Sequence, residues 1–243
     1  MAGHSKWAKV KHFKGAIDAK RSRIFAKLSR EISIATKIGG GEPSMNPRLR
    51  MVLLKCRSAN MPSDNIERAI KKGLGGGGEA ALEDLTYEIF GPHGVAFLVE
   101  LTSDNRNRTS AEIRAILTRN AGTLATAGAV SRLFHRKGQL IIARDTAAED
   151  QVMQVALESG AEDFKSEQEG YEIITDPQHF ETVHRHLEKA GIRCEAAQIT
   201  WLPDIWVEVN EPASALAVRR LEESLDEHED VKEVYTNAAL PQI

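Results

Sequence analysis

The sequence predicts an α+β protein in which a bundle of three helices precedes two α/β domains. Three observations lead to this prediction. Apolar residues recur at helical spacing up to residue 73, strand and helix patterns alternate beyond residue 84, and a glycine-rich stretch separates the two regions. The chain of 243 residues is 42% hydrophobic and 28% charged, which is enough apolar material for a sizeable core.

The first domain, residues 1–73, is expected to contain three amphipathic helices. Gly39–Gly41 supplies a stop for the first helix, and Asn46 followed by proline is a favourable start for the second. Asp64 and Glu67 resemble a capping box at the start of the third. The predicted helices cover residues 17–38, 47–59 and 63–73.

Residues 74–84 are interpreted as a linker, because the run Gly73–Gly78 contains one leucine among five glycines. A phosphate-binding loop is the alternative. Such a loop requires a preceding strand and a following Lys-Ser or Lys-Thr pair, and this sequence has neither.

The rest of the chain reads as alternating strands and helices. Residues 137–202 follow the order β-α-β-β-α-β, which is a complete ferredoxin-like unit. The segments on either side each form part of such a unit, so residues 85–136 and 203–240 are predicted to make one discontinuous ferredoxin-like domain with 137–202 inserted. The expected strands are 85–90, 95–101, 129–135, 139–143, 162–165, 171–175, 194–200, 205–209 and 231–235, and the expected helices are 111–120, 147–158, 177–190 and 213–225.

Charge is unevenly distributed along the chain, although the formal net charge is only -3. Residues 1–72 contain 17 Lys and Arg against 5 Asp and Glu, a net charge of +12. Residues 73–243 contain 15 Lys and Arg against 30 Asp and Glu, a net charge of -15. This asymmetry indicates that the first domain faces a polyanion while the acidic α/β domains contact protein partners.

The first helix is predicted to carry a continuous basic face. On a helical wheel its basic side chains fall within an arc of about 100°, separate from the apolar arc. An ordinary solvated face mixes both signs of charge, and a cleaved targeting peptide would not be needed to bury two further helices. We therefore favour phosphate binding. The basic residues are Lys20, Arg23, Lys27, Arg30 and Lys37, with Arg21 among the apolar positions.

Further candidate phosphate contacts lie in three other segments. An N-terminal arm could order on a nucleic acid as it displaces counterions, and Trp7 either stacks on an unpaired base or pins the arm to the bundle. The loop 102–109 either caps the helix that follows it or offers arginines to phosphate. These candidates are Lys6, Lys9, Lys11, His12 and Lys14 in the arm, Arg48 and Arg50 on the second helix, and Arg106 and Arg108 in the loop.

Catalytic and cofactor-binding motifs are not found in the sequence. Walker, dinucleotide-binding, nucleophile-elbow and zinc-protease patterns are all missing. Cys56 and Cys194 are 138 positions apart without metal-ligand spacing, so reduced thiols are expected rather than a disulfide. We predict a non-enzymatic protein with no cofactor, no metal, no small-molecule substrate and no membrane span, although catalysis and a purely structural role remain alternatives.

Seven stretches resemble the YebC/PmpR family, which also includes the mitochondrial translational activator of cytochrome oxidase subunit one. The resemblance covers nearly the whole chain. It implies a three-helix bundle followed by two α/β domains in a cytoplasmic, non-catalytic protein. The stretches are AGHSKW, KHFKGAIDAKR, NPRLR, NMPSDNIERAIKKG, FGPHGVAFLVE, DNRNRT and DVKEVYTN.

The resemblance implies a nucleic-acid partner but leaves two partners open. Bacterial members are usually labelled DNA-binding transcriptional regulators, whereas mitochondrial and some bacterial members resemble translation factors that act on ribosomes, where this chain would bind ribosomal RNA. This chain departs from the family pattern at Ile89-Phe90 and at 121–130, where more glycine is usual. Ala121 and Ala125 are expected to stiffen that loop.

Overall fold

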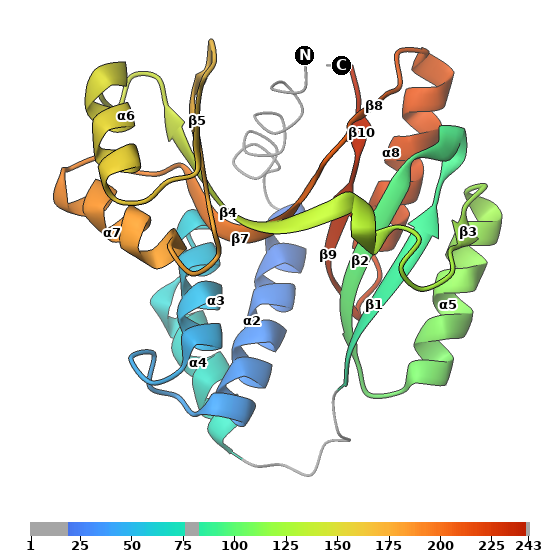
Figure 1. Ribbon diagram of the computed structural model, residues 1–243. Coiled ribbons are helices and arrows are strands. Elements are labelled where there is room, and N and C mark those ends of the chain that lie inside the picture. The colour runs from blue at the N-terminus through green and yellow to red at the C-terminus, as the bar shows by residue number, and fades with distance from the viewer. Residues whose placement is uncertain (1–18, 76–82, 242–243) are drawn as a thin grey trace. The chain divides into compact units, whose positions relative to one another are not determined.

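The computed structural model describes residues 19–75 and 83–241 (Figure 1). It divides the chain into two compact units. Among the described residues, unit 1 contains 83–135 and 201–241, and unit 2 contains 19–75 and 136–200. The fold is α+β, with N-terminal helices followed by α/β domains. The N-terminal arm and most of the predicted linker lie outside the described residues.

Three helices form the bundle of unit 2, namely α2 (Ala19–Gly39), α3 (Pro47–Ser58) and α4 (Ser63–Leu74). Helix α2 contacts both others, and the apolar positions predicted from the sequence meet between them. Ile32, Leu49 and Cys56 are fully buried there. Burial of each large apolar side chain contributes about 1.5–3 kcal/mol, so this core holds the three short helices together.

Asn46 joins two helix ends. Its Oδ1 accepts a hydrogen bond from the backbone N–H of Leu49 at 3.0 Å, which caps α3 as the sequence predicts. Its Nδ2 donates to the carbonyl oxygens of Ala35 at 2.9 Å and Gly40 at 2.8 Å, at the end of α2. The side chain is 3% exposed. One buried amide therefore satisfies backbone groups of both helices and sets the turn between them.

The two ends of α4 differ from the predicted helix. The N-cap is Pro62, which offers no side-chain hydrogen bond, so the expected capping box of Asp64 and Glu67 is wrong. At the other end α4 continues through Gly73 instead of stopping there. A Cβ at Gly73 would lie 2.6 Å from the carbonyl oxygen of Ser33 and 2.7 Å from Cβ of Thr36. Glycine is needed at this position because it lets α4 approach α2.

The inserted α/β domain of unit 2 follows the predicted ferredoxin-like order. Its sheet has the strand order β5-β6-β4-β7, and α6 and α7 pack on one face through residues that include Leu140, Ile173 and Phe180. Met51 and Leu54 of α3 pack against the same core, so the bundle and this domain share apolar contacts. The elements are β4 (Phe134–Ala143), α6 (Glu149–Glu158), β5 (Asp163–Ser166), β6 (Gly170–Thr175), α7 (Phe180–Lys189) and β7 (Ala196–Pro203).

Unit 1 contains a second four-stranded sheet, with the order β3-β1-β2-β9. Strand β2 is central and almost fully buried, and it pairs antiparallel with β1 and β9. Helices α5 and α8 share one core with β1, β2 and β9. The elements are β1 (Glu83–Phe90), η1 (Pro92–Gly94), β2 (Ala96–Ser103), α5 (Arg106–Arg119), β3 (Thr123–Leu124), η2 (Ser131–Leu133), β8 (Val207–Glu208), α8 (Pro212–Asp226), β9 (Val231–Thr236) and β10 (Ala238–Ala239).

The loop before β4 contains a 3-10 turn, whereas the sequence predicts an extended segment at 129–135. Residues 131–133 form the 3-10 turn η2, and the strand begins only at Phe134. Glu88 of β1 holds this loop, because its carboxylate accepts hydrogen bonds of 2.6–2.8 Å from the backbone N–H groups of Gly128, Val130 and Ser131. Burial alone would raise the pKa of Glu88, but these donors outweigh it and lower the pKa.

Helix α5 ends in a left-handed turn at Ala121, whose φ is 52°. The N–H of Gly122 donates to the carbonyl oxygen of Leu117 at 2.9 Å, which is the hydrogen bond of a Schellman motif. Glycine is usual at the left-handed position, and a Cβ there costs about 1–2 kcal/mol. The alanine that departs from the family pattern is therefore in an unfavourable backbone conformation.

We predict that Gly73→Ala destabilises the bundle by about 1–2 kcal/mol. The new Cβ overlaps the backbone of α2, and the strain exceeds the gain of about 1 kcal/mol in helix propensity. Gly75→Ala is the matched control, because a Cβ there comes no closer than 3.4 Å to any neighbour. Urea unfolding of both variants measures the difference, and equal stabilities would contradict the close approach of the two helices.

We predict that Ala121→Gly stabilises the protein by about 0.5–1 kcal/mol. Relief of the left-handed strain exceeds the added entropy of the unfolded chain. Ala115→Gly, at an exposed position inside α5, is the control and should destabilise by about 1 kcal/mol. Thermal unfolding gives both values. If Ala121→Gly makes the protein less stable, the left-handed turn is not formed.

Candidate nucleic-acid interface

The structure describes only some of the residues predicted to contact nucleic acid. Those of the arm lie outside the described residues, and Lys20, Arg21 and Arg23 are placed on α2 by their backbone alone. Lys27 and Arg30, one turn further along, are half-buried, as is Arg48 on α3. The arm residues are Lys6, Trp7, Lys9, Lys11, His12 and Lys14.

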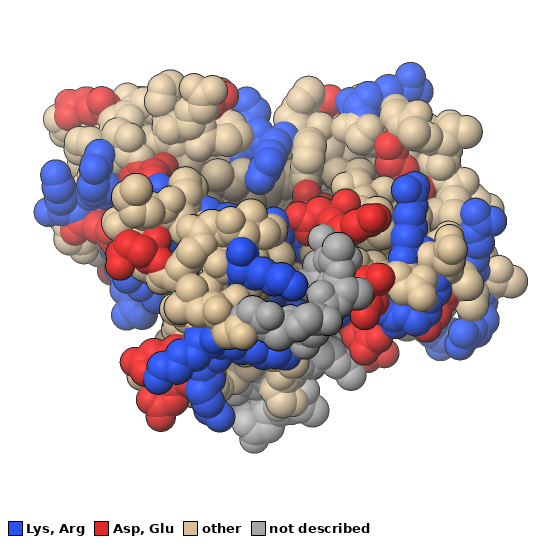
Figure 2. All heavy atoms as spheres, turned by 90° about the horizontal axis from the view of Figure 1, so that it is seen from below, with Lys and Arg blue, Asp and Glu red and all other residues tan. Residues whose placement is uncertain are grey.

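The residues that α2 contributes to the bundle core lie apart from its basic residues, whereas Ile34, four positions after Arg30 and on the basic side, is also buried. Leu28, Ile32 and Ala35 are buried in the bundle core, and positions 20, 23, 27 and 30 repeat at helical spacing outside that set. Lys37, Lys71 and Lys72 are exposed at the other end of the bundle. Figure 2 views the molecule from below and shows basic side chains grouped there beside a smaller acidic group. The bundle therefore presents positive charge on more than one side.

Arg50 supports the fold around the predicted interface. Its Nη1 donates to the carbonyl oxygens of Pro43 at 2.8 Å and Ser44 at 3.0 Å, which closes the loop between α2 and α3. Its Nε lies 3.4 Å from Oε1 of Glu181 on α7. These contacts give Arg50 a positioning role, so we leave it out of the interface proposed below.

The loop between β2 and α5 is ordered by its own hydroxyl and amide groups. Asn105 caps α5, with its Oδ1 accepting from the N–H of Arg108 at 3.1 Å. The hydroxyls of Ser103 and Thr109 lie 2.6 Å apart and are buried. The capping role predicted for this loop is confirmed for Asn105. Arg106, in the same turn, is exposed to solvent.

Arg108 is surrounded by carboxylates. Its Nη1 lies 2.7 Å from Glu229 and 3.4 Å from Glu112, and its Nη2 lies 2.8 Å from Asp230 and 3.2 Å from Asp104. The hydrogen bond to Glu229, together with the charges of the other acids, raises the pKa of Arg108 despite an opposing effect of burial. The guanidinium ties α5 to the turn before β9, and we do not include it in the interface.

Asp230 depends on this arginine. Its side chain is fully buried, and its Oδ2 also accepts a hydrogen bond of 2.6 Å from the hydroxyl of Thr109. A buried carboxylate requires a cation or several donors. The sequence did not reveal this pairing, because Arg108 and Asp230 are 122 positions apart. The stretches DNRNRT and DVKEVYTN contain Arg108 and Asp230 respectively, but the sequence does not show that the two residues meet.

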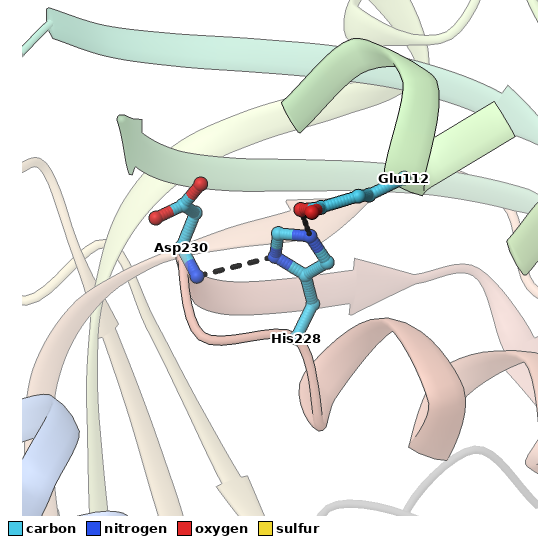
Figure 3. Close-up of side chains that lie close together, drawn as sticks. All are labelled: Glu112, His228 and Asp230. Carbon is cyan, nitrogen blue, oxygen red and sulfur yellow. Dashed lines mark hydrogen bonds and ion pairs between the residues drawn. The ribbon is translucent and has the colours of Figure 1, made fainter. Parts of the chain in front are cut away.

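Glu112, His228 and Asp230 have ligand atoms within 4.8 Å of one another, a spacing that a metal ion could use (Figure 3). The hydrogen bonds favour a structural role instead. Nδ1 of His228 accepts from the backbone N–H of Asp230 at 3.1 Å, so its proton lies on Nε2, which is 2.9 Å from Glu112. Both ring nitrogens and both acids thus have protein partners, and Arg108 supplies the positive charge.

Both cysteines are free thiols in the structure. Burial raises the pKa of Cys56 to about 11 and that of Cys194 to about 12. Neither thiol is activated as a nucleophile, because reactive cysteines have a lowered pKa. Among the described residues, no helix is long and apolar enough to span a membrane.

Comparisons with known proteins match both parts of the chain. Residues 5–76 match the model for the TACO1/YebC protein N-terminal domain, and residues 82–238 match the model for the TACO1/YebC second and third domain. A probable transcriptional regulatory protein from Halothermothrix orenii is 48% identical over 243 residues, covering 99% of this chain and 96% of that protein.

Two further proteins agree with this. A probable transcriptional regulatory protein from Persephonella marina is 45% identical, covering 100% of this chain and 97% of that protein. The crystal structure of a conserved hypothetical protein from Aquifex aeolicus superposes with a TM-score of 0.80 at 42% identity, covering 93% of each chain. The similarity therefore extends over the full length of the chain and includes its three-dimensional fold.

We predict that Arg108→Ala destabilises unit 1 by about 3 kcal/mol, because it removes the guanidinium that pairs with the buried carboxylate of Asp230. Arg106→Ala is the matched control, since it removes an exposed arginine from the same turn. The unfolding free energy from denaturant titration measures both effects. Comparable losses in the two variants would show that the carboxylates around Arg108 do not depend on it.

Proposed function

The chain belongs to the TACO1/YebC family, and from this premise we propose that it is a non-enzymatic regulator of gene expression that binds DNA through its basic bundle. Curated relatives that match over the full length are named probable transcriptional regulatory proteins. DNA binding itself rests on the charge and geometry of this chain. We propose that the acidic α/β domains contact protein partners.

The observation that carries this proposal is the concentration of positive charge in the bundle. Between residues 19 and 75 the chain has 13 Lys and Arg against 4 Asp and Glu. Lys27 and Arg30 lie apart from Leu28, Ile32 and Ala35, the residues of α2 that are buried in the bundle core. Lysine and arginine that neutralise phosphates release condensed counterions, and this release supplies most of the affinity for DNA. Such a surface binds phosphate without requiring a particular sequence.

The acidic regions limit where nucleic acid can bind. The net charge of residues 73–243 is -15, so the α/β domains repel a phosphate backbone at low salt. Arg108 cannot offset this repulsion because four carboxylates already surround it. Of the phosphate contacts predicted from the sequence, those on the bundle helices and the exposed Arg106 remain candidates within the described residues, and we propose that the arm residues extend the same interface.

Ribosomal RNA is the alternative polyanion, because its phosphates would meet the same cations. Affinities for duplex DNA and for ribosomal RNA fragments, measured side by side with the unmodified protein, distinguish the two partners. Tighter binding to duplex DNA supports the proposal, and tighter binding to the RNA fragments overturns the choice of DNA while retaining the interface.

We predict that changing Lys20, Arg23, Lys27 and Arg30 together to Ala weakens binding to every DNA sequence. Affinity falls as salt rises, and loss of four phosphate contacts should make the slope of log affinity against log salt shallower by roughly one unit per contact. Fluorescence polarisation across a salt series, with circular dichroism to verify folding, measures this slope.

The control removes four exposed cations from the α/β domains, namely Arg114, Arg119, Arg185 and Lys189. It changes the net charge equally and should leave the slope nearly as in the unmodified protein. Equal slopes for the two variants would show that total charge, rather than the basic face of α2, determines binding.

A further inference from the structure

A cavity of about 460 Å³ lies within unit 2, between the end of α3 and the segment that connects α7 to β7. Its volume is in the range of pockets that hold small organic groups. Leu54, Ile192 and Ala197 give it apolar walls, and Leu54 also packs on the core of the inserted domain. No function described above uses this cavity.

The polar groups around the cavity carry both signs of charge. Arg57 and Arg193 are exposed among its lining residues, one from the bundle and one from the inserted domain. Glu188 and Glu195 also line it. The ligand must therefore present an anionic group to the arginines and hydrogen-bond donors to the carboxylates.

Two helix ends add negative potential. Helix α3 ends at Ser58 and α7 at Lys189, and residues at both C-terminal ends, including Asn60 and Gly191, line the cavity. The carbonyl groups of a helix C-terminus carry a partial negative charge. A free phosphate inside would meet these carbonyls and Glu188. A cationic peptide would meet the two arginines and the basic bundle, so both are poor ligands.

The wall of the cavity includes a flat ring. His184 stacks on Phe180 with ring centroids 6.1 Å apart and an interplanar angle of 8°. Burial lowers the pKa of His184 against the opposing charge of Glu188, and Arg57 lowers it further. The neutral imidazole adds a planar, uncharged surface, which suits an aromatic ligand better than an ion.

We propose that this cavity binds one unpaired nucleotide of the nucleic acid held by the bundle. The base enters between the apolar walls and presents its amino groups to the carboxylates, while the phosphate remains at the edge with Arg57 and Arg193. Adenine, cytosine and guanine carry such amino groups, whereas uracil and thymine do not. This inference rests on the proposed function, because the bundle supplies most of the affinity.

The first test measures binding of the full chain to short single-stranded oligonucleotides of A, C or U, as DNA (with T for U) and as RNA. Arg193→Ala should weaken binding to A and C by about tenfold, through loss of a charge-assisted contact. Arg185→Ala is the matched control, since it removes an exposed arginine of α7 outside the cavity and should change affinity by about twofold or less.

A second variant tests recognition of the base. Glu188→Gln preserves size but removes the charged acceptor, and it should reduce the preference for A and C over U and T. Photo-crosslinking with an oligonucleotide that contains 8-azidoadenosine identifies the contact. The labelled peptide should come from residues 184–197 or 54–60.

The outcomes separate this inference from the proposed function. If the Arg193→Ala and Arg185→Ala variants bind oligonucleotides with equal affinity, or if the crosslinks lie elsewhere, the cavity is not a nucleotide site. The proposed basic interface is then unaffected. If the unmodified protein binds no nucleic acid, the proposed function fails and the inference fails with it. If Arg193→Ala weakens binding to DNA and RNA oligonucleotides equally, the site contacts only the base and the phosphate. If it weakens binding to only one of them, that nucleic acid is the source of the nucleotide.

Discussion

The rest of the structure depends on the pairing of two neighbouring strands, β4 and β7. The chain leaves unit 1 along β4 after His135 and returns along β7 at Trp201, and the two strands are adjacent in one sheet. On the unit 1 side, the backbone N–H of Asp204 donates to the carbonyl oxygen of Leu133 at 3.0 Å, and its carboxylate lies 2.8 Å from His135. These contacts hold the segment that enters β4 beside the segment that follows β7. A whole domain can therefore be inserted between them without separating the strands of unit 1.

The insertion has a consequence for function, because the inserted domain contacts the bundle. Met51 and Leu54 of α3 pack against its core, and Arg50 reaches Glu181 of α7. The basic bundle therefore belongs to the same compact unit as an acidic α/β domain. Under the proposed function, nucleic acid at the bundle would be attracted by the bundle and repelled by the inserted domain. We therefore propose that binding is confined to the bundle and to the edge of the cavity that carries Arg57 and Arg193.

Local features were predictable from the sequence, and distant pairings were not. The periodicity of residues 17–38 predicted the C-terminal end of α2 to within one residue, because burial of one helix face imposes that spacing. Asn46 was predictable as a cap because capping is local, but its second role at the end of α2 was not. The partners of Arg108 come from four positions in two distant segments, and only the folded chain brings them together. The cavity beside Arg193 likewise needs α3 and the loop before β7, which are more than a hundred residues apart.

The most direct test of the account is crosslinking of the full-length protein in living cells, followed by sequencing of the bound nucleic acid and mass spectrometry of the crosslinked peptides. We expect peptides from α2 and α3 and enrichment of DNA upstream of genes. Peptides confined to unit 1 would contradict the basic bundle as the interface. Enrichment of ribosomal RNA without enrichment of DNA upstream of genes would contradict its proposed role as a DNA-binding regulator.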